Sequence, residues 1–345
     1  MARVALDLLG GDGAPEVVAD AVGILTREDV DIDLVLVGPP DLAEALLAAR
    51  GIHRGRLEVC AAHDVVPMDA RPLDALRADA SRAHPRMSVM VAAMAVRDGK
   101  ADAWVSVGHT GASVTAAALV LGRIAGMTRP ALAVVLPGLE GPVVLVDAGA
   151  SLDASPEALA QFAVAGWGYA RGLGVQRPQV GLLNIGHEPG KGDELRLRAF
   201  AELSARLPLM GIDFVGNVEG SDVARGAAAQ VIVTDGFTGN VLLKGIEGAV
   251  DWAAQRMGTA YGDLGPARAV VRAVGTGDFA GGMLLGVNGI TVVGHGAGNA
   301  AQICACVRLA ARSVDAGTLD LTREAVSALG AEESGPPPAV ERVGP

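Results

Sequence analysis

Two of the three lysines in this chain stand in or beside glycine-rich stretches. Lys191 lies in "GHEPGKGDE" and Lys244 follows "DGFTGN", whereas Lys100 lies elsewhere. A lysine ammonium is a compact point charge suited to phosphate, and glycine lets the backbone approach a bound anion closely. A solvated helix face for Lys244 and a mobile loop for Lys191 are the alternatives. The neighbouring glycines favour an anion site that uses both lysines.

Three histidines lie in similar loops, because His109, His187 and His295 each follow a predicted strand. No H-x-x-x-H or histidine–carboxylate spacing accompanies them, so we expect no bound metal and no other cofactor. For His295 we favour the role of general acid or hydrogen-bond donor.

Covalent catalysis is not indicated by the sequence. The motif G-x-S-x-G is absent, and Cys304 and Cys306 lie in an apolar helical run where core packing is expected. Asp7 and Asp12 form either a carboxylate pair or caps for the turn and the helix that follow. We favour capping for Asp12.

Seven predicted strands end in glycine-rich polar loops. In chain order the loops read "GGDGAP", "GHTGA", "DAGAS", "IGHEPGKGDE", "GNVEGSD", "DGFTGNVLLK" and "GHGAGN". If the strands are parallel, their carboxyl ends share the edge where open α/β sheets bind ligands. "GGDGAP" lacks the dinucleotide spacing and "GHEPGKGD" lacks the P-loop spacing. The loops therefore predict an anion site, but neither a nicotinamide site nor a Walker-type nucleotide site.

Alternating strands and helices must position these loops. Apolar runs predict strands at 3–9, 33–38, 56–61, 103–108, 132–137, 142–148, 179–186, 211–216, 230–236 and 290–296. Helical periodicity predicts helices at 15–28, 85–98, 156–171 and 193–206. "PGLEG" between two strands predicts a local antiparallel hairpin. The expected fold class is a three-layer α/β fold with a mainly parallel, doubly wound sheet.

Composition narrows the class of protein. The 345 residues are 50% hydrophobic and carry a formal net charge of −11, and this acidity argues against extensive nucleic-acid binding. Three cysteines do not make a disulfide framework. The sequence shows no secretion signal and no membrane-length apolar run, so we expect a soluble cytoplasmic protein.

No linker divides the main part of the chain. We expect residues 1–331 to form a single two-lobed domain. Residues 332–345 are rich in proline and charge and are expected to form a disordered tail.

Taken together, these loops resemble a known family. The blocks "ALDLLGGDGAPE", "DAWVSVGHTGA", "LVDAGAS", "GLLNIGHEPGKGDEL", "FVGNVEGSD", "DGFTGNVLLK" and "LLGVNGITVVGHG" are similar, in this order, to the PlsX family of phosphate acyltransferases. The resemblance implies conversion of acyl-acyl carrier protein and inorganic phosphate to acyl phosphate for phospholipid synthesis. It implies a fold similar to isopropylmalate dehydrogenases and phosphotransacetylases. It also implies a homodimer, peripheral association with a membrane glycerol-phosphate acyltransferase, and no nucleic-acid partner.

The loops and the resemblance together give the expected site residues. Catalytic roles fall to Lys191, Asn240, Lys244 and His295. Substrate and phosphate binding fall to Gly10, Gly11, Asp12, His109, Thr110, Gly111, Asn184, Gly190, Asn217, Glu219, Asp235, Gly236 and Gly239. Phosphate is already a competent nucleophile and a thiol leaves readily. Such a site must supply orientation and charge neutralisation more than strong acid–base catalysis.

Three loops depart from the family pattern. Gly13 stands where the family has histidine, His109 where it has asparagine, and "HGAGN" where it has His-Gly-Ser-Ser-Asp. One hypothesis is that His109 supplies the imidazole lost at Gly13. The alternative is that Gly13 relaxes a turn and His109 is a solvated replacement. The departures leave open a different donor, acyl-coenzyme A, or a non-catalytic scaffold of the same fold.

An acidic carrier protein requires a local positive patch on this acidic chain. Arg77, Arg82 and Arg86 form the densest basic cluster, and Arg123 and Arg129 form a second. A solvated helix surface is the alternative interpretation.

Overall fold

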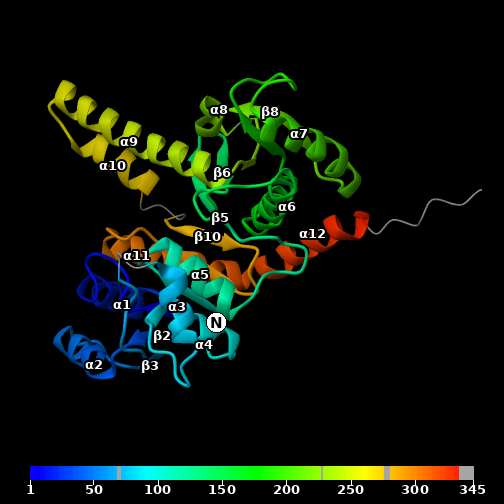
Figure 1. The fold of residues 1–345 in the computed structure, drawn as a ribbon. Helices are drawn as coiled ribbons and strands as arrows, with labels where there is room; N and C mark the ends of the chain where they lie inside the picture. Colours follow the sequence, from blue (N-terminus) through cyan, green and yellow to red (C-terminus); the bar gives the residue numbers. More distant parts are fainter. Residues whose placement is uncertain (68–70, 227, 276–279, 334–345) are drawn as a thin grey trace, which may run out of the picture.

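One mixed sheet of eleven strands runs through the computed structural model, which describes residues 1–67, 71–226, 228–275 and 280–333 (Figure 1). The strand order is β3-β2-β1-β4-β11-β10-β5-β6-β9-β7-β8. The strands are β1 (Ala2–Asp7), β2 (Ile32–Gly38), β3 (Leu57–Ala61), β4 (Ala103–Ser106), β5 (Ala131–Gly138), β6 (Gly141–Val146), β7 (Val180–Asn184), β8 (Phe214–Glu219), β9 (Val231–Val233), β10 (Gly282–Leu285) and β11 (Ile290–Val293). Neighbouring strands are parallel except in the pairs β11–β10, β10–β5 and β5–β6, which confirms the mainly parallel α/β class.

The expectation that the seven glycine-rich loops share one edge is wrong. Three successive antiparallel pairs reverse the chain direction at the centre of the sheet. The loops after β1, β4 and β11 therefore leave one edge, and those after β6, β7 and β9 leave the other. Strands β10 and β11 are four residues long, about 13 Å at 3.3 Å per residue. Because the sheet is this narrow at its centre, loops from both edges reach the same region.

Two strands differ from their predictions. β8 begins three residues after the predicted 211–216, so that "GNVE" lies inside the strand instead of in a loop. Gly216, with φ of +91°, and Asn217 are poor strand formers, which explains the difference. β10, with the sequence "GMLL" between glycines, shows no alternation and is not predicted at all. The predicted hairpin is confirmed by the antiparallel pair β5–β6.

Helices cover both faces of the sheet, as the doubly wound class requires. They are α1 (Glu16–Glu28), α2 (Pro40–Ala49), α3 (Pro72–Ala80), α4 (Ser88–Arg97), α5 (Thr110–Val120), α6 (Pro156–Gly172), α7 (Glu194–Arg206), α8 (Gly220–Arg225), α9 (Gly236–Tyr261), α10 (Gly265–Gly275), α11 (Ala300–Asp315) and α12 (Thr318–Glu333). The four predicted helices are present. The one predicted to start at residue 85 begins at Ser88 instead, because Asp79 accepts the backbone N–H groups of Arg86 and Met87 just before it.

The core is continuous on one face and divided on the other. Alternation in β1 turns Val4 and Leu6 towards a core that extends across the sheet under α1, α11 and α6. Ala5 points to the opposite face, where α3, α4 and α5 cover a separate core. A third core, under α8 and α9, lies farther along this second face. The division leaves a gap between α5 and α9 above the central strands.

Helices α9 and α10 pack against each other and extend away from the sheet (Figure 1). In the described part of the chain, no helix has the length and apolarity needed to cross a membrane. At the other end, α12 continues to Glu333, so the tail expected from residue 332 starts inside a helix. The remaining tail residues, 334–345, lie outside the described residues.

Candidate active site

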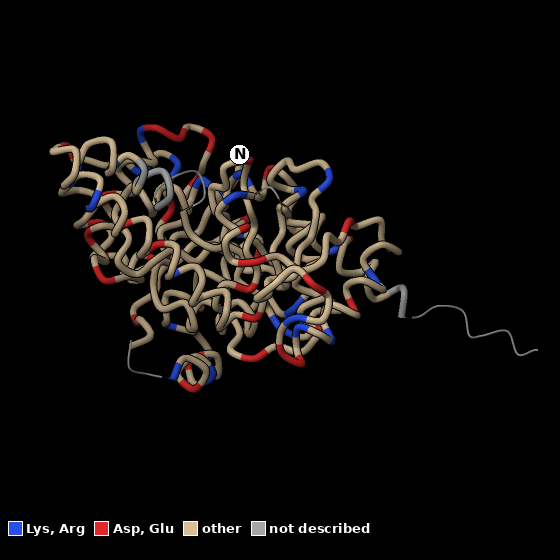
Figure 2. The backbone as a smooth tube through the Cα atoms, turned by 90° about the horizontal axis from the view of Figure 1, so that it is seen from above, with Lys and Arg blue, Asp and Glu red and all other residues tan. Residues whose placement is uncertain are grey.

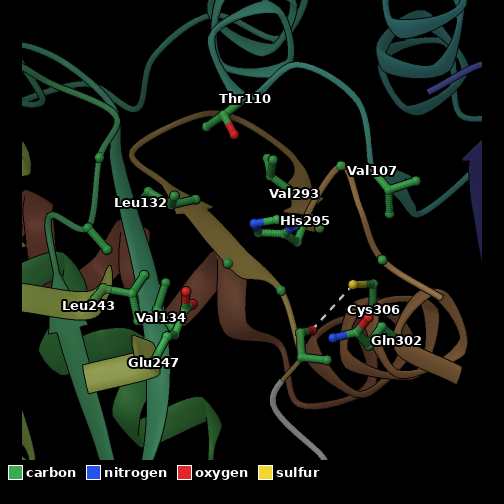
Figure 3. Close-up of a pocket in the computed structure, with 18 of the residues that line it drawn as sticks. Val107, Thr110, Leu132, Val134, Leu243, Glu247, Val293, His295, Gln302 and Cys306 are labelled. Atoms are coloured by element: carbon green, nitrogen blue, oxygen red, sulfur yellow. Dashed lines mark hydrogen bonds between the residues drawn. The ribbon is translucent and has the colours of Figure 1, made fainter. Parts of the chain in front are cut away.

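A cavity of about 730 Å³ opens over the central strands, between the N-terminal ends of α5 and α9. One side comes from the loops after β1, β4 and β11, and the other comes from β5 and α9 (Figure 3). Six of the expected site residues line it: Asp12, His109, Thr110, Asn240, Lys244 and His295. The cavity therefore combines residues that follow strands in both halves of the sheet.

The loop after β4 brings the N-terminus of α5 to the cavity. Gly108, His109 and Thr110 line the cavity there, and N–H groups in the first turn of a helix have no partner within the helix. His109 is the N-cap, because its Nδ1 accepts the N–H of Ala112 at 3.3 Å. Asparagine is a favoured N-cap, so His109 can cap α5 in place of the family's asparagine. A side chain at Gly13 would meet Val17 of its own turn, and the exchange of imidazoles stays a prediction.

The loop after β11 contributes His295 beside Asp12. The N–H of Asp12 donates to the carbonyl of Gly296 at 2.8 Å, which joins the β1 and β11 loops. The N–H of Ala297 donates to Nδ1 of His295 at 3.2 Å. Both His109 and His295 thus accept a backbone N–H at Nδ1. In their neutral forms both rings carry their proton on Nε2 and can donate it to a ligand.

The two aspartates Asp7 and Asp12 have different roles in the structure. Asp7 is buried and accepts the Ser106 hydroxyl at 2.9 Å and the Leu9 N–H at 3.0 Å, so it caps the turn and joins β1 to β4. Burial raises the pKa of the Asp7 carboxyl. Asp12 does not cap α1 as expected, because Pro15 occupies the N-cap position without a side-chain hydrogen bond. Asp12 lines the cavity instead.

Helix α9 supplies the opposite wall with one polar side chain, Asn240, and one pair of oppositely charged side chains, Lys244 and Glu247. Asn240, Lys244 and Glu247 follow each other at helical spacing and all line the cavity. Lys244 Nζ lies 2.7 Å from Glu247 Oε2, and both side chains are about half exposed. Among the described lining residues, Lys244 is the one lysine or arginine. The sequence prediction missed Glu247, although its position three residues after Lys244 places it beside that lysine.

The glycines of "DGFTGN" pack against the turn after β6. The Asp147 carboxylate in that turn accepts backbone N–H groups from Leu132, Gly149, Ala150 and Ser151. A Cβ at Gly239 would lie 1.9 Å from the Asp147 carbonyl oxygen, and one at Gly236 would lie 2.1 Å from the Ser151 carbonyl oxygen. Both glycines allow α9 to start directly against this turn. In this structure they act through backbone packing and do not line the cavity.

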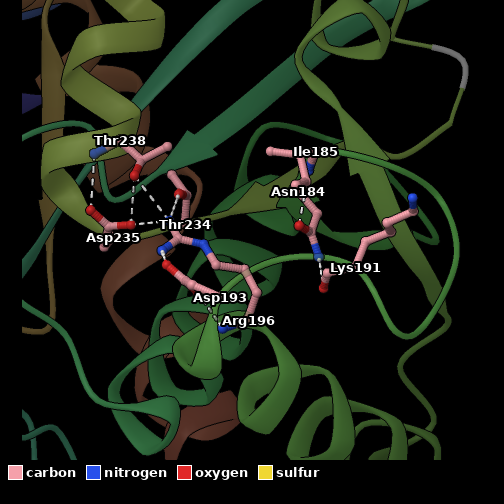
Figure 4. Close-up of polar contacts among 8 residues, drawn as sticks. All are labelled: Asn184, Ile185, Lys191, Asp193, Arg196, Thr234, Asp235 and Thr238. Atoms are coloured by element: carbon pink, nitrogen blue, oxygen red, sulfur yellow. Dashed lines mark hydrogen bonds and ion pairs between the residues drawn. The ribbon is translucent and has the colours of Figure 1, made fainter.

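The ends of β7 and β8 and the loop after β7 form a separate polar cluster, of which Figure 4 shows Asn184 and Lys191. Asn184 Nδ2 donates to the carbonyl of Lys191 at 3.0 Å and to Asn217 Oδ1 at 3.1 Å. Asn217 Nδ2 donates to the carbonyl of Glu188 at 2.8 Å. These amides hold the backbone of the β7–α7 loop, and the Lys191 side chain is exposed. The expected site residues that do not line the cavity are Gly10, Gly11, Gly111, Asn184, Gly190, Lys191, Asn217, Glu219, Asp235, Gly236 and Gly239.

His187 fastens the same loop to α8. Its Nε2 lies 2.9 Å from Asp222 and its Nδ1 lies 3.7 Å from Glu219. The hydrogen bond to Asp222 raises the pKa of His187. Because the folded-state pKa is raised, this contact is complete at pH values below the ordinary histidine range and weakens as the pH rises through the raised value.

Arg196 joins this cluster to the helix that lines the cavity, a role that the sequence prediction missed. Its guanidinium donates to Asp235, the N-cap of α9, and to the hydroxyl of Thr238 at 2.9 Å (Figure 4). It also donates to Asp193, the N-cap of α7, at 3.0 Å. Burial alone would raise the pKa of Asp235, but the bonds from Thr238 and Arg196 lower it. The three-residue spacing from Asp193 to Arg196 is the sequence signal that could have indicated the contact between these two residues.

Sequence comparisons identify relatives along nearly the whole chain. A family model described as "Fatty acid synthesis protein" matches residues 2–320. The phosphate acyltransferase of Desulfitobacterium hafniense is 40% identical over 331 residues, covering 92% of this chain and 96% of that protein. That of Thermus thermophilus is 40% identical over 338 residues, covering 95% and 99%.

Solved structures share the fold at low sequence identity. A phosphotransacetylase from Streptococcus pyogenes has a TM-score of 0.62 and 17% identity, covering 91% of this chain and 94% of that chain. The EutD phosphotransacetylase from Staphylococcus aureus has a TM-score of 0.61 and 16% identity, with the same coverage. These structures confirm the expected similarity of fold to phosphotransacetylases and show nothing about activity. The family match and the relatives at 40% identity show that this chain belongs to the PlsX family of phosphate acyltransferases.

Proposed function

We propose that this chain transfers the acyl group of acyl-acyl carrier protein to inorganic phosphate and so forms acyl phosphate. The observation that carries the proposal is the composition of the cavity, whose lining divides into donors for an anion and apolar side chains from β5 and α9. An acyl phosphate has this same division, with a charged head and a hydrocarbon chain. The names of the relatives support phosphate as the acyl acceptor.

The reaction needs few proton transfers. A phosphate oxygen attacks the thioester carbonyl carbon, the C–O bond forms, the C–S bond breaks, and the thiolate leaves to take up a proton from water. Free thiols have a pKa of about 8.5, so the leaving group is a good one near neutral pH. The protein must hold the phosphate against the carbonyl and stabilise the oxyanion that develops there.

The cavity residues divide these tasks. We assign phosphate binding to Lys244 and the N-terminal amides of α5, since both line the cavity and both attract an anion. Nε2–H of His295 and the amide of Asn240 are proposed donors to the carbonyl oxygen. Arg196 acts on the cavity through its contacts with Asp235 and Thr238 at the start of α9. For Lys191 we propose that substrate binding brings its loop to the phosphate.

The direct test is mass spectrometry of the products formed by the purified protein from phosphate and several acyl donors. Acyl phosphate made from acyl-acyl carrier protein in preference to acyl-coenzyme A supports the proposal. Preference for acyl-coenzyme A would instead show a phosphotransacetylase-like enzyme. No acyl phosphate from any donor would overturn the proposal in favour of a non-catalytic scaffold.

A carrier protein would dock on arginines around α3. Arg82 lies 3.7 Å from Asp79 and Arg86 lies 2.8 Å from Asp64, so both have acidic neighbours. Acidic and basic residues are interspersed over the molecule (Figure 2), and this cluster follows α3 on the same side of the sheet as α5. We propose it as the docking patch because α5 leads to the cavity.

Reversing both charges, Arg82→Glu with Arg86→Glu, should raise the KM for acyl-acyl carrier protein severalfold and flatten its dependence on salt. Rim charges act mainly through steering, which salt screens. Turnover of an acyl-pantetheine donor, which has no carrier protein, is the control and should not change. An unaltered salt dependence would place docking elsewhere, and a thermal melt would detect loss of the pair with Asp64.

We also propose a homodimer and a peripheral association with a membrane glycerol-phosphate acyltransferase, as the family resemblance implies. Exposed apolar side chains on the projecting α9 support the dimer. Trp252 is 67% exposed and Tyr261 is 80% exposed, an unusual state for such large side chains in a monomer.

A further inference from the structure

The cavity continues into an apolar groove between β5 and α9. Leu132, Val134 and Leu136 lie at alternating positions of β5 and so share one face of the sheet. Leu243 and Ile246 line the groove from α9. Val134 and Ile246 are each only partly buried, and both pack against the core beneath α8 and α9. The groove thus offers apolar surface that the protein itself does not fill.

The direction of α9 fixes which end of the groove is polar. Asn240 lies against Gly149, in the turn that Asp147 holds to the backbone of Leu132. The Leu132 end of β5 is therefore the end with the proposed carbonyl donor. Farther along α9, Leu243 and Ile246 follow at helical spacing. Lys244 and Glu247 line the same wall, where they pair with each other at 2.7 Å and are each about half exposed.

We propose that this groove binds the acyl chain of the substrate and that Val134 and Ile246 set the chain length it accepts. The inference rests on the proposed function. From Leu132 to Leu136 the strand extends about 13 Å, room for roughly ten extended methylenes with C–C bonds near 1.5 Å. The substrate class is accordingly an acyl group of medium or greater length, with its thioester at Asn240.

The test is the chain-length preference of Ile246→Trp, whose indole fills the groove. A hexadecanoyl donor should lose at least about tenfold in kcat/KM relative to wild type, since each methylene removed from an apolar site costs about fourfold. A butanoyl donor, which stops short of Ile246, should keep its rate. Val134→Ala, which widens the floor without adding bulk, should shift the preference towards longer chains.

Val241→Trp is the matched control, because this residue lies on the outward side of the same helix and is 58% exposed. It should leave the chain-length preference unchanged. If Ile246→Trp lowers both donors equally or neither, the groove is not the acyl site, while the proposed function stands. If wild type forms no acyl phosphate at all, the proposed function fails. Calorimetry with decanoate then tests the groove independently of turnover. Decanoate should bind wild type and Val241→Trp, but not Ile246→Trp.

Discussion

Lys244→Ala should raise the phosphate concentration needed for half-maximal turnover by tenfold or more. Lys244 is the one lysine or arginine among the described residues that line the cavity. A hydrogen bond between charged groups contributes about 1.5–3 kcal/mol, and about 1.4 kcal/mol corresponds to tenfold in affinity. Its present partner, Glu247, is half exposed, and such pairs are weak enough for a phosphate dianion to displace. Steady-state kinetics at varied phosphate, with acyl donor saturating, measures the effect.

The other two lysines serve as comparisons. Lys100→Ala, three residues after the end of α4, should leave the phosphate requirement unchanged. Lys191→Ala tests whether the β7–α7 loop joins the phosphate site in the working enzyme, because this exposed side chain does not line the cavity in the present structure. A phosphate requirement unaffected by Lys244→Ala would remove α9 from the phosphate site.

Local sequence signals were enough to predict most elements of the fold. Apolar runs such as "VALDLL" and the caps at Ser155 and Asp193 specify strands and helix starts through nearby interactions only. β10 was not predicted because a four-residue strand between glycines has no hydrophobic periodicity. Its extended conformation depends on pairing with β5 and β11. β8 was displaced because its Gly216 and Asn217 have loop propensities, although Asn217 is buried by its partners.

The candidate site was harder to predict because it depends on strand direction. Six expected residues do line one cavity, since each lies in a loop after a strand or in the N-terminal part of a helix near the centre of the sheet. The predicted hairpin at "PGLEG" already indicated that the strand direction reverses between β5 and β6. Every later strand that is parallel to β6 then runs opposite to β5, and its loop leaves the other edge of the sheet. Contacts such as Arg196 with Asp235 join segments 39 residues apart and follow only from the packed structure.

The packing of α9 leads to a prediction on Gly239. Gly239→Ala should destabilise the fold and reduce activity, because the new Cβ would lie 1.9 Å from the Asp147 carbonyl oxygen. That oxygen belongs to Asp147, whose side-chain carboxylate accepts four backbone N–H groups, so the residue cannot move away at low cost. Overpacking of this kind typically lowers the free energy of unfolding by about 1–3 kcal/mol. Thermal denaturation should show a lowered midpoint, and displacement of α9 would carry Asn240 and Lys244 away from the cavity.

Gly245→Ala gives the matched comparison on the same helix. A Cβ there would meet nothing within 4 Å, and alanine favours helix over glycine by about 1 kcal/mol. The two glycine-to-alanine changes should therefore move the midpoint in opposite directions. The comparison also separates two roles for Gly239, packing and phosphate binding. If Gly239→Ala keeps the wild-type midpoint but raises the phosphate requirement, its backbone contacts the anion and the packing explanation is wrong. A lowered midpoint with Gly245→Ala unimpaired shows instead that Gly239 allows α9 to start against the Asp147 turn.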